Sequence, residues 1–159
     1  IFMNKWLKKK IIDPLVDLLK QGTTPSKLAW SVAAGLAIGT SPLIGTSTLV
    51  CIAAGFLFRL NHPAIQIAHL ALSPLQVPFL FFFIYAGEKL FDQPHVVPII
   101  IQEIKSGSFS PFTTLETYWT SFWHAGVVWV LVAIPLFIIL GLILSFLFQR
   151  IKHSMETTP

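Results

Sequence analysis

The chain has a single cysteine and few charged side chains, and both shortages restrict the classes of protein to which it can belong. With Cys51 alone, no intrachain disulfide can form. Charged residues make up 11% of the sequence, whereas a soluble domain has about 25%. So few charges cannot cover the water-facing surface of a chain of 159 residues that is 54% hydrophobic. The composition excludes an ordinary soluble enzyme and favours an integral membrane protein.

Motifs that carry chemistry are also missing. The sequence has no metal-spaced set of His, Cys and Glu, no nucleophile elbow and no phosphate-binding loop. Its five histidines are scattered, and no spacing pairs one of them with a serine. We therefore expect no catalytic residue, no metal site and no cofactor, and we expect that the protein is not an enzyme. An enzyme acting on lipid-linked substrates has the least support, because no acid–base pair is visible.

The few charges leave three long uncharged segments. These lie between Lys27 and Arg59, between Arg59 and Glu88, and between Glu116 and Arg150. Each segment exceeds the ~20 apolar residues that cross a bilayer core. None has the polar face at a period of 3.6 residues that a long soluble helix shows. The sequence therefore predicts an all-α integral membrane protein.

Basic charge gathers at the N-terminus. Residues 1–27 hold six lysines and two aspartates, which account for the whole net charge of +4. Residues 1–21 are predicted to form a basic amphipathic segment on an anionic membrane surface, with a solvated tail as the alternative. Asp13-Pro14 has the pattern of an N-cap and first residue of a short helix. Charge confined to one end argues against a nucleic-acid partner, and it places the N-terminus in the cytoplasm.

The first apolar region, about 25–58, is predicted to contain short broken or re-entrant helices. Thr24-Pro25 caps its first half, which breaks at 39–42 and resumes at 43. Each half is ~23 Å long as a helix, short of the ~30 Å hydrocarbon core. Two full short crossings are equally consistent with the pattern of charges.

The rest of the chain is predicted to hold two longer helices. The first covers 64–91 and is kinked at Ser73-Pro74; the second spans about 115–149, with Thr113 and Glu116 as its capping box. The basic residues after the second helix favour the cytoplasm, so we expect a multi-pass protein of the inner membrane with both termini cytoplasmic. The predicted units are a basic surface segment (1–21), a membrane domain (22–91), an external loop with a short interfacial helix (92–113), a transmembrane helix (114–150) and a tail (151–159).

Polar side chains surround the two breaks. Thr40-Ser41-Pro42-Leu43 resembles Leu72-Ser73-Pro74-Leu75, either by chance or as the matched broken helices of a transporter repeat. Polar groups at membrane depth often mark a binding site, although Ser and Thr also bond their own helix and Arg59 can snorkel to headgroups. The candidate ligand site comprises Arg59, Asn61, Ser41, Thr46, Ser47, Ser73 and Gln76. The helix-break and packing residues are Gly35, Gly39, Pro42, Gly45 and Pro74.

The order and spacing of residues in 22–91 resemble a known family. The features are Gly22, Thr24-Pro25, Ala33-Ala34-Gly35, Gly39, Pro42, Gly45, Arg59, Asn61, Pro63, Ser73-Pro74 and Tyr85-Ala86-Gly87. In this order they resemble DUF2062, a bacterial membrane domain of unknown function. The resemblance implies Asn-Pro at the second break, where this chain has Ser73-Pro74. It also implies the bacterial inner membrane, and it supplies no activity.

Two functions are consistent with these features. The first is transport or handling of a small molecule or an anionic lipid, in a homo-oligomer because so few helices enclose little volume. The alternative is a structural or partner-binding membrane protein without transport. A polar cavity that reaches Arg59 and both breaks would favour the first function, and a dry, tightly packed interior would favour the second.

Overall fold

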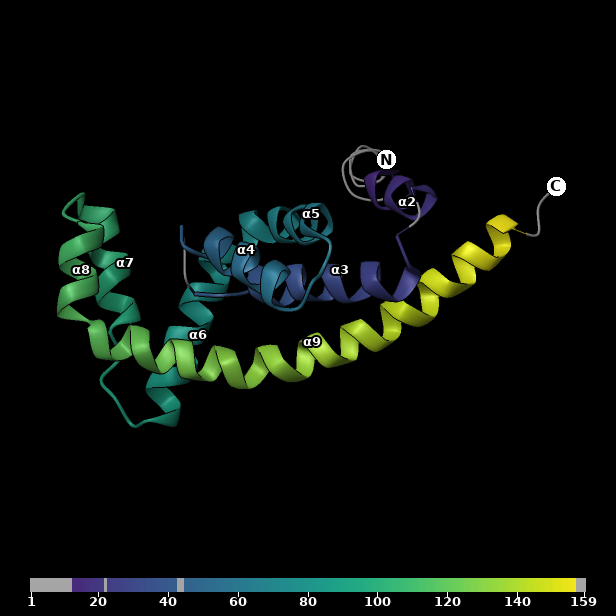
Figure 1. The fold of residues 1–159 in the computed structure, drawn as a ribbon. Helices are drawn as coiled ribbons and strands as arrows, with labels where there is room; N and C mark the ends of the chain where they lie inside the picture. The colour runs from purple at the N-terminus through teal and green to yellow at the C-terminus, as the bar shows by residue number, and fades with distance from the viewer. Residues whose placement is uncertain (1–12, 22, 43–44, 157–159) are drawn as a thin grey trace, which may run out of the picture.

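The computed structural model describes residues 13–21, 23–42 and 45–156, and every element within these ranges is a helix (Figure 1). The predicted all-α fold class is thereby confirmed for the described residues. Most of the predicted surface segment, residues 1–12, lies outside them. The elements are α2 (Asp13–Lys20), α3 (Pro25–Gly39), α4 (Ser47–Leu57), α5 (His62–Leu72), the 3-10 turn η2 (Ser73–Leu75), α6 (Gln76–Leu90), α7 (Val97–Ser106), α8 (Pro111–Thr117) and α9 (Trp119–Glu156).

Helix α3 is the centre of the molecule, and ten of its 15 residues are buried. It packs against α9 on one side and against α5 on the other, with α4 and α2 alongside (Figure 1). Its start is as predicted, because the Thr24 side chain accepts the Lys27 backbone N–H at 3.4 Å and Pro25 takes the first helical position. Leu28 packs near Leu144 in one apolar cluster, so α3 begins beside the C-terminal half of α9.

The first predicted break is confirmed. Helix α3 ends at Gly39, and the chain folds back into α4, which begins at Ser47. Gly45 lies in the turn with a φ of +87°, a conformation that only glycine adopts without strain. Residues 43–44, where the second half was predicted to start, lie outside the described residues. Helices of 15 and 11 residues are ~22 and ~16 Å long, so neither alone matches the thickness of a bilayer core.

Helix α5 runs parallel to α3, in contact along its length. The backbone N–H of Asn61 donates to Ser31 Oγ at 2.7 Å at one end, and Gly39 lies against Leu72 at the other. Both helices therefore end at the same level, each at its Ser-Pro break. The Ser-Pro dipeptides that the two similar tetrapeptides share, Ser41-Pro42 and Ser73-Pro74, therefore lie at the matching ends of two parallel helices.

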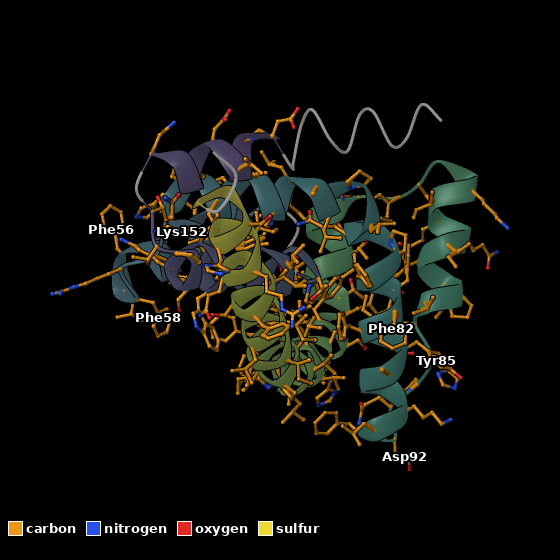
Figure 2. The ribbon with its side chains drawn as sticks, turned by 90° about the vertical axis from the view of Figure 1, so that its right-hand side faces the viewer. Phe56, Phe58, Phe82, Tyr85, Asp92 and Lys152 are labelled. Carbon is orange, nitrogen blue, oxygen red and sulfur yellow. The ribbon has the colours of Figure 1, made fainter. Side chains whose placement is uncertain are left out.

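The predicted kink after α5 is present as η2, which contains Pro74. Beyond it, α6 takes a new direction and crosses α9 steeply (Figure 1). Figure 2 shows Phe82 and Tyr85 along α6 and Asp92 beyond its end. The contact with α9 is close, because a Cβ on Gly87 would lie 2.9 Å from the Ala125 backbone nitrogen.

The final helix does not begin as predicted. Pro111 starts the separate helix α8, the chain breaks at Tyr118, and α9 runs from Trp119 to Glu156. The predicted capping box at Thr113 is wrong, since the Thr113 hydroxyl donates to Ser110 Oγ at 3.3 Å from inside α8. Proline fixes φ near the helical value and lacks the N–H that a first turn leaves unpaired, so Ser110-Pro111 is the stronger start signal.

Candidate functional site

The two helix breaks meet in a group of buried polar side chains, Ser47, His69 and Gln76, here called the break cluster. Ser47 begins α4, His69 lies near the end of α5, and Gln76 begins α6. The Gln76 side-chain N–H donates to Ser47 Oγ at 3.3 Å, and Ser47 Oγ lies 3.4 Å from His69 Nε2. None of the three is more than 8% exposed. Folding therefore joins residues that are 22 and 29 positions apart in the sequence.

The hydrogen-bond pattern leaves one nitrogen of the break cluster, Nδ1 of His69, without a partner among the described residues. Because Ser47 Oγ accepts from Gln76, its own proton is available for His69 Nε2. An imidazole that accepts at Nε2 and is neutral carries its proton on Nδ1. Within the described residues His69 Nδ1 has no hydrogen-bond partner, although it is fully shielded. Leaving such a group unpaired costs about 1–3 kcal/mol.

Ser41 is a second unpartnered polar group at the same end of the helix pair. It is completely buried, and its Oγ has no partner within 13–21, 23–42 and 45–156. It follows Gly39, whose missing side chain brings α3 against Leu72 of α5. Buried polar groups are normally paired by protein or ordered water, so each of these two atoms is available to bond a water molecule or a small polar solute.

Glycines on one face of α3 allow the close approach that builds this region. A Cβ on Gly35 would overlap the carbonyl oxygen of Ile65 and lie 2.8 Å from Ala68 Cβ. A Cβ on Gly39 would lie 3.1 Å from Leu72 Cβ. Residues four apart share a helix face, so this pair lets two backbones touch over one turn. His69 is positioned by that contact, since its backbone nitrogen lies against Gly35.

Helix α9 fixes the end of α3. The indole N–H of Trp129 donates to both the Ala37 carbonyl oxygen and Thr40 Oγ1, each at 3.3 Å. The Thr40 hydroxyl in turn donates to the Ala37 carbonyl at 2.8 Å. Two of these bonds reach the Ala37 carbonyl oxygen, one of those that a helix C-terminus leaves without the usual intrahelical donor. The Thr40 hydroxyl therefore serves the backbone of its own helix.

Arg59 and Asn61 do not join the break cluster, so the described residues do not form one polar cavity that reaches Arg59 and both breaks. They lie beyond the other end of α4, and 11 helical residues separate the two ends by ~16 Å. Asn61 is the N-cap of α5, and its Oδ1 accepts the Ala64 N–H at 3.1 Å. Arg59 is exposed in the turn between α4 and α5, with a φ of +52°.

The remaining predicted residues surround the breaks without bonding to the cluster in any contact of the described chain. Ser73 is half-buried at the end of α5, and Pro74 is exposed in η2. Pro42 is buried next to Ser41, whereas Gly45 and Thr46 are exposed in the turn before α4. Thr46 makes no side-chain cap bond, so the N-terminus of α4 is open at that position.

The sequence interpretation missed a buried carboxylate. Glu88, in the last turn of α6, is completely buried. It accepts the Val96 backbone N–H at 2.9 Å and lies 3.2 Å from Nδ1 of the exposed His95. Glu88 shares a helix face with Ile84 four residues earlier, which was the available sign that it points into the core. It anchors the turn between α6 and α7 and lies outside the break cluster.

A model of a protein family described as "Uncharacterized protein conserved in bacteria (DUF2062)" matches residues 8–156. The resemblance inferred from residues 22–91 is confirmed, and the match extends over nearly the whole chain. No curated protein and no solved structure matches the sequence. What the site does must therefore be inferred from its own geometry.

Proposed function

The chain belongs to the DUF2062 family of bacterial proteins, and from that premise we propose that it is a multi-spanning inner-membrane protein that binds a small polar solute where its broken helices meet. The observation that carries this proposal is the shielded, unpartnered Nδ1 of His69 at the junction of two helix breaks. The membrane location and the solute are separate parts of the proposal, and each has its own support and test.

The exposure of the apolar helices supports the membrane location. Two helical runs, His62–Leu90 and Trp119–Ser154, are long and apolar enough to cross a bilayer. The core helix of a soluble protein also meets that criterion, but it is mostly buried. Here only 28% and 17% of the most apolar windows are buried inside the molecule. So much exposed apolar surface requires lipid or another apolar partner; on α9 it includes Leu131, Ile134, Ile138, Leu142 and Phe146.

The orientation of α3 supports termini on one side of the membrane. Lys27 lies in the first turn of α3. This turn packs beside Leu144 and Phe148 of α9, which are close in sequence to Arg150. Basic residues near the ends of apolar helices favour the cytoplasmic face. We therefore propose that the basic segment and the end of α9 both face the cytoplasm. Reporter fusions at the two ends test this, and opposite locations would contradict it.

The chemistry of the break cluster indicates the class of solute. Helices α3 and α5 end there and α4 and α6 begin there, so backbone carbonyl and N–H groups converge with neutral side chains. With the Ser47 proton assigned to Nε2, His69 Nδ1 is a donor, and the Ser41 hydroxyl can donate or accept. We therefore propose a small solute that has a hydrogen-bond acceptor and no net charge.

Binding is better supported than hydrolysis, although Ser47 and His69 form a pair. In a Ser–His catalytic pair a third group orients the base through its second nitrogen. Within the described residues that nitrogen of His69 has no partner. Gln76 moreover donates to the Ser47 oxygen, which reduces its nucleophilicity. We therefore propose a binding site and no enzymatic activity.

Thiol reactivity in sealed vesicles tests the proposal, and the native cysteine supplies the control. Cys51 lies one helical turn after Ser47, fully buried in an apolar cluster with Ile38 and Ile65. The double variant Ser47→Cys/Cys51→Ala carries its only thiol in the break cluster. A small hydrophilic thiol reagent should modify this variant and leave wild-type Cys51 intact. Equal resistance of both thiols would contradict the entry of solutes into the cluster.

Resistance of the Ser47→Cys thiol is the outcome expected of a structural or partner-binding protein. The glycine-mediated contact of α3 with α5 is the observation that favours this second function. Membrane location is tested separately, because a peripheral protein is released from membranes by alkaline carbonate and a spanning one is retained. We also propose a homo-oligomer, which crosslinking in the native membrane tests.

A further inference from the structure

An open groove of about 450 Å³ lies at the opposite end of α3 from the break cluster. Three segments form it: the first turns of α3, the turn between α4 and α5, and the middle of α9. Here it is called the Arg59 groove. It is lined by Thr24, Ser26, Lys27, Trp30, Phe58, Arg59, Leu60 and Phe137.

Two cations converge on the Arg59 groove without a carboxylate. Lys27 and Arg59 come from different segments, and none of the described residues that line the groove is acidic. No ion pair of either cation is found within the described residues. The N-terminal turn of α3 adds the positive end of its dipole. This rim is complementary to one anionic group.

The other side of the groove is aromatic. Trp30 and Phe137 pack with ring centroids 5.0 Å apart, and Phe58 is 62% exposed. Figure 2 shows the side chains of Phe56 and Phe58 projecting outward from the molecule. A free inorganic anion would leave these rings in water, whereas a molecule with a charged head and an apolar tail would cover both parts.

We propose that the Arg59 groove binds an anionic phospholipid, with its phosphate between Lys27 and Arg59 and an acyl chain against Phe58 and Phe137. Arginine and lysine both recognise phosphate, arginine through two parallel hydrogen bonds. The site rests on the membrane location proposed above and is independent of solute binding at the break cluster. It gives Arg59 a specific role in place of general snorkelling.

Native mass spectrometry of the delipidated full chain, titrated with dioleoyl phosphatidylglycerol and dioleoyl phosphatidylcholine, tests the site. The variant Lys27→Gln/Arg59→Gln should bind phosphatidylglycerol about tenfold more weakly, since two charge-assisted contacts are lost. The control Lys89→Gln/Lys105→Gln removes the same charge from exposed positions outside the groove. It should change the affinity less than about twofold. Equal losses in the two variants, or equal binding of both lipids by the wild type, would overturn the proposal.

A second variant separates a lipid from a free phosphate group. Phe58→Ala should weaken binding of dioleoyl phosphatidylglycerol and leave binding of its dihexanoyl analogue unchanged. Phe58 is exposed, so its removal should not disturb folding. Displacement of the long-chain lipid by millimolar inorganic phosphate, or equal effects on both chain lengths, would contradict a lipid site. The thiol-reactivity experiment at Ser47 is unaffected by either result, so the two proposals fail separately.

Discussion

The substitution Gly35→Ala tests the contact on which the break cluster depends. It adds one methyl group where α3 and α5 are closest. The new Cβ would overlap the Ile65 carbonyl oxygen, and it would lie 2.8 Å from Ala68 Cβ and 3.1 Å from the His69 backbone nitrogen. Two of these three neighbours are backbone atoms, which cannot rotate away. The helices must therefore separate, and His69 must move with α5.

Two opposing effects determine how much Gly35→Ala changes the free energy of unfolding. Overpacking of this kind costs about 1–3 kcal/mol. Alanine is more favourable than glycine inside a helix by about 1 kcal/mol, which offsets part of the loss. Gly126→Ala in α9 isolates the second effect, because within the described residues the added Cβ has no neighbour within 4 Å beyond the backbone of its own helix and its two chain neighbours. Gly35→Ala should therefore lower the free energy of unfolding of the protein by about 1 kcal/mol, and Gly126→Ala should raise it by a similar amount.

The free energy of unfolding is measured by titrating the protein in mixed micelles with dodecyl sulfate and following helical circular dichroism. Opposite signs for the two variants are expected, with a separation of about 2 kcal/mol. If Gly35→Ala stabilised the protein as much as Gly126→Ala, the close approach of α3 and α5 would be refuted. The position assigned to His69 would then be refuted with it.

Three further substitutions test other contacts by the same unfolding measurement. Asn61→Ala removes the cap of α5 and should cost about 1 kcal/mol, whereas Asn61→Asp keeps an acceptor and should cost less; equal costs would argue against capping. Trp129→Phe removes the N–H that donates to the Ala37 carbonyl oxygen and Thr40 Oγ1, and it should lower the free energy of unfolding by about 1 kcal/mol. Unchanged stability would contradict these hydrogen bonds. Glu88→Leu leaves the Val96 N–H unpaired and should cost about 1–3 kcal/mol and speed proteolysis after α6, while unchanged cleavage would exclude Glu88 as the anchor.

Local signals in the sequence were sufficient for most helix boundaries. Thr24-Pro25 marks the start of α3 because a hydroxyl cap and a proline act within one turn. Breaks at Ser41-Pro42 and Ser73-Pro74 were predictable for the same reason. The start of the last helix was not, since Ser110-Pro111 and Thr113 offer competing caps three residues apart. Which one is used depends on packing that a short window does not contain.

The candidate site was less predictable, because it is assembled by contacts between distant segments. Ser47 and Gln76 were recognised as polar groups near breaks, but the hydrogen bonds of Ser47 with Gln76 and His69 require α4 to fold back along α5. The same folding carries Arg59 to the far end of α4, where it lines a different groove. A polar residue close in sequence to a break is therefore not necessarily close to it in space.

The most direct test of the central claim is an experimental structure in lipid nanodiscs, at a resolution that shows ordered water and solute. We predict non-protein density within ~3.2 Å of His69 Nδ1, beside the ends of α3 and α5. A histidine whose Nδ1 is bonded to a protein carbonyl, in a dry and fully packed junction, would contradict it.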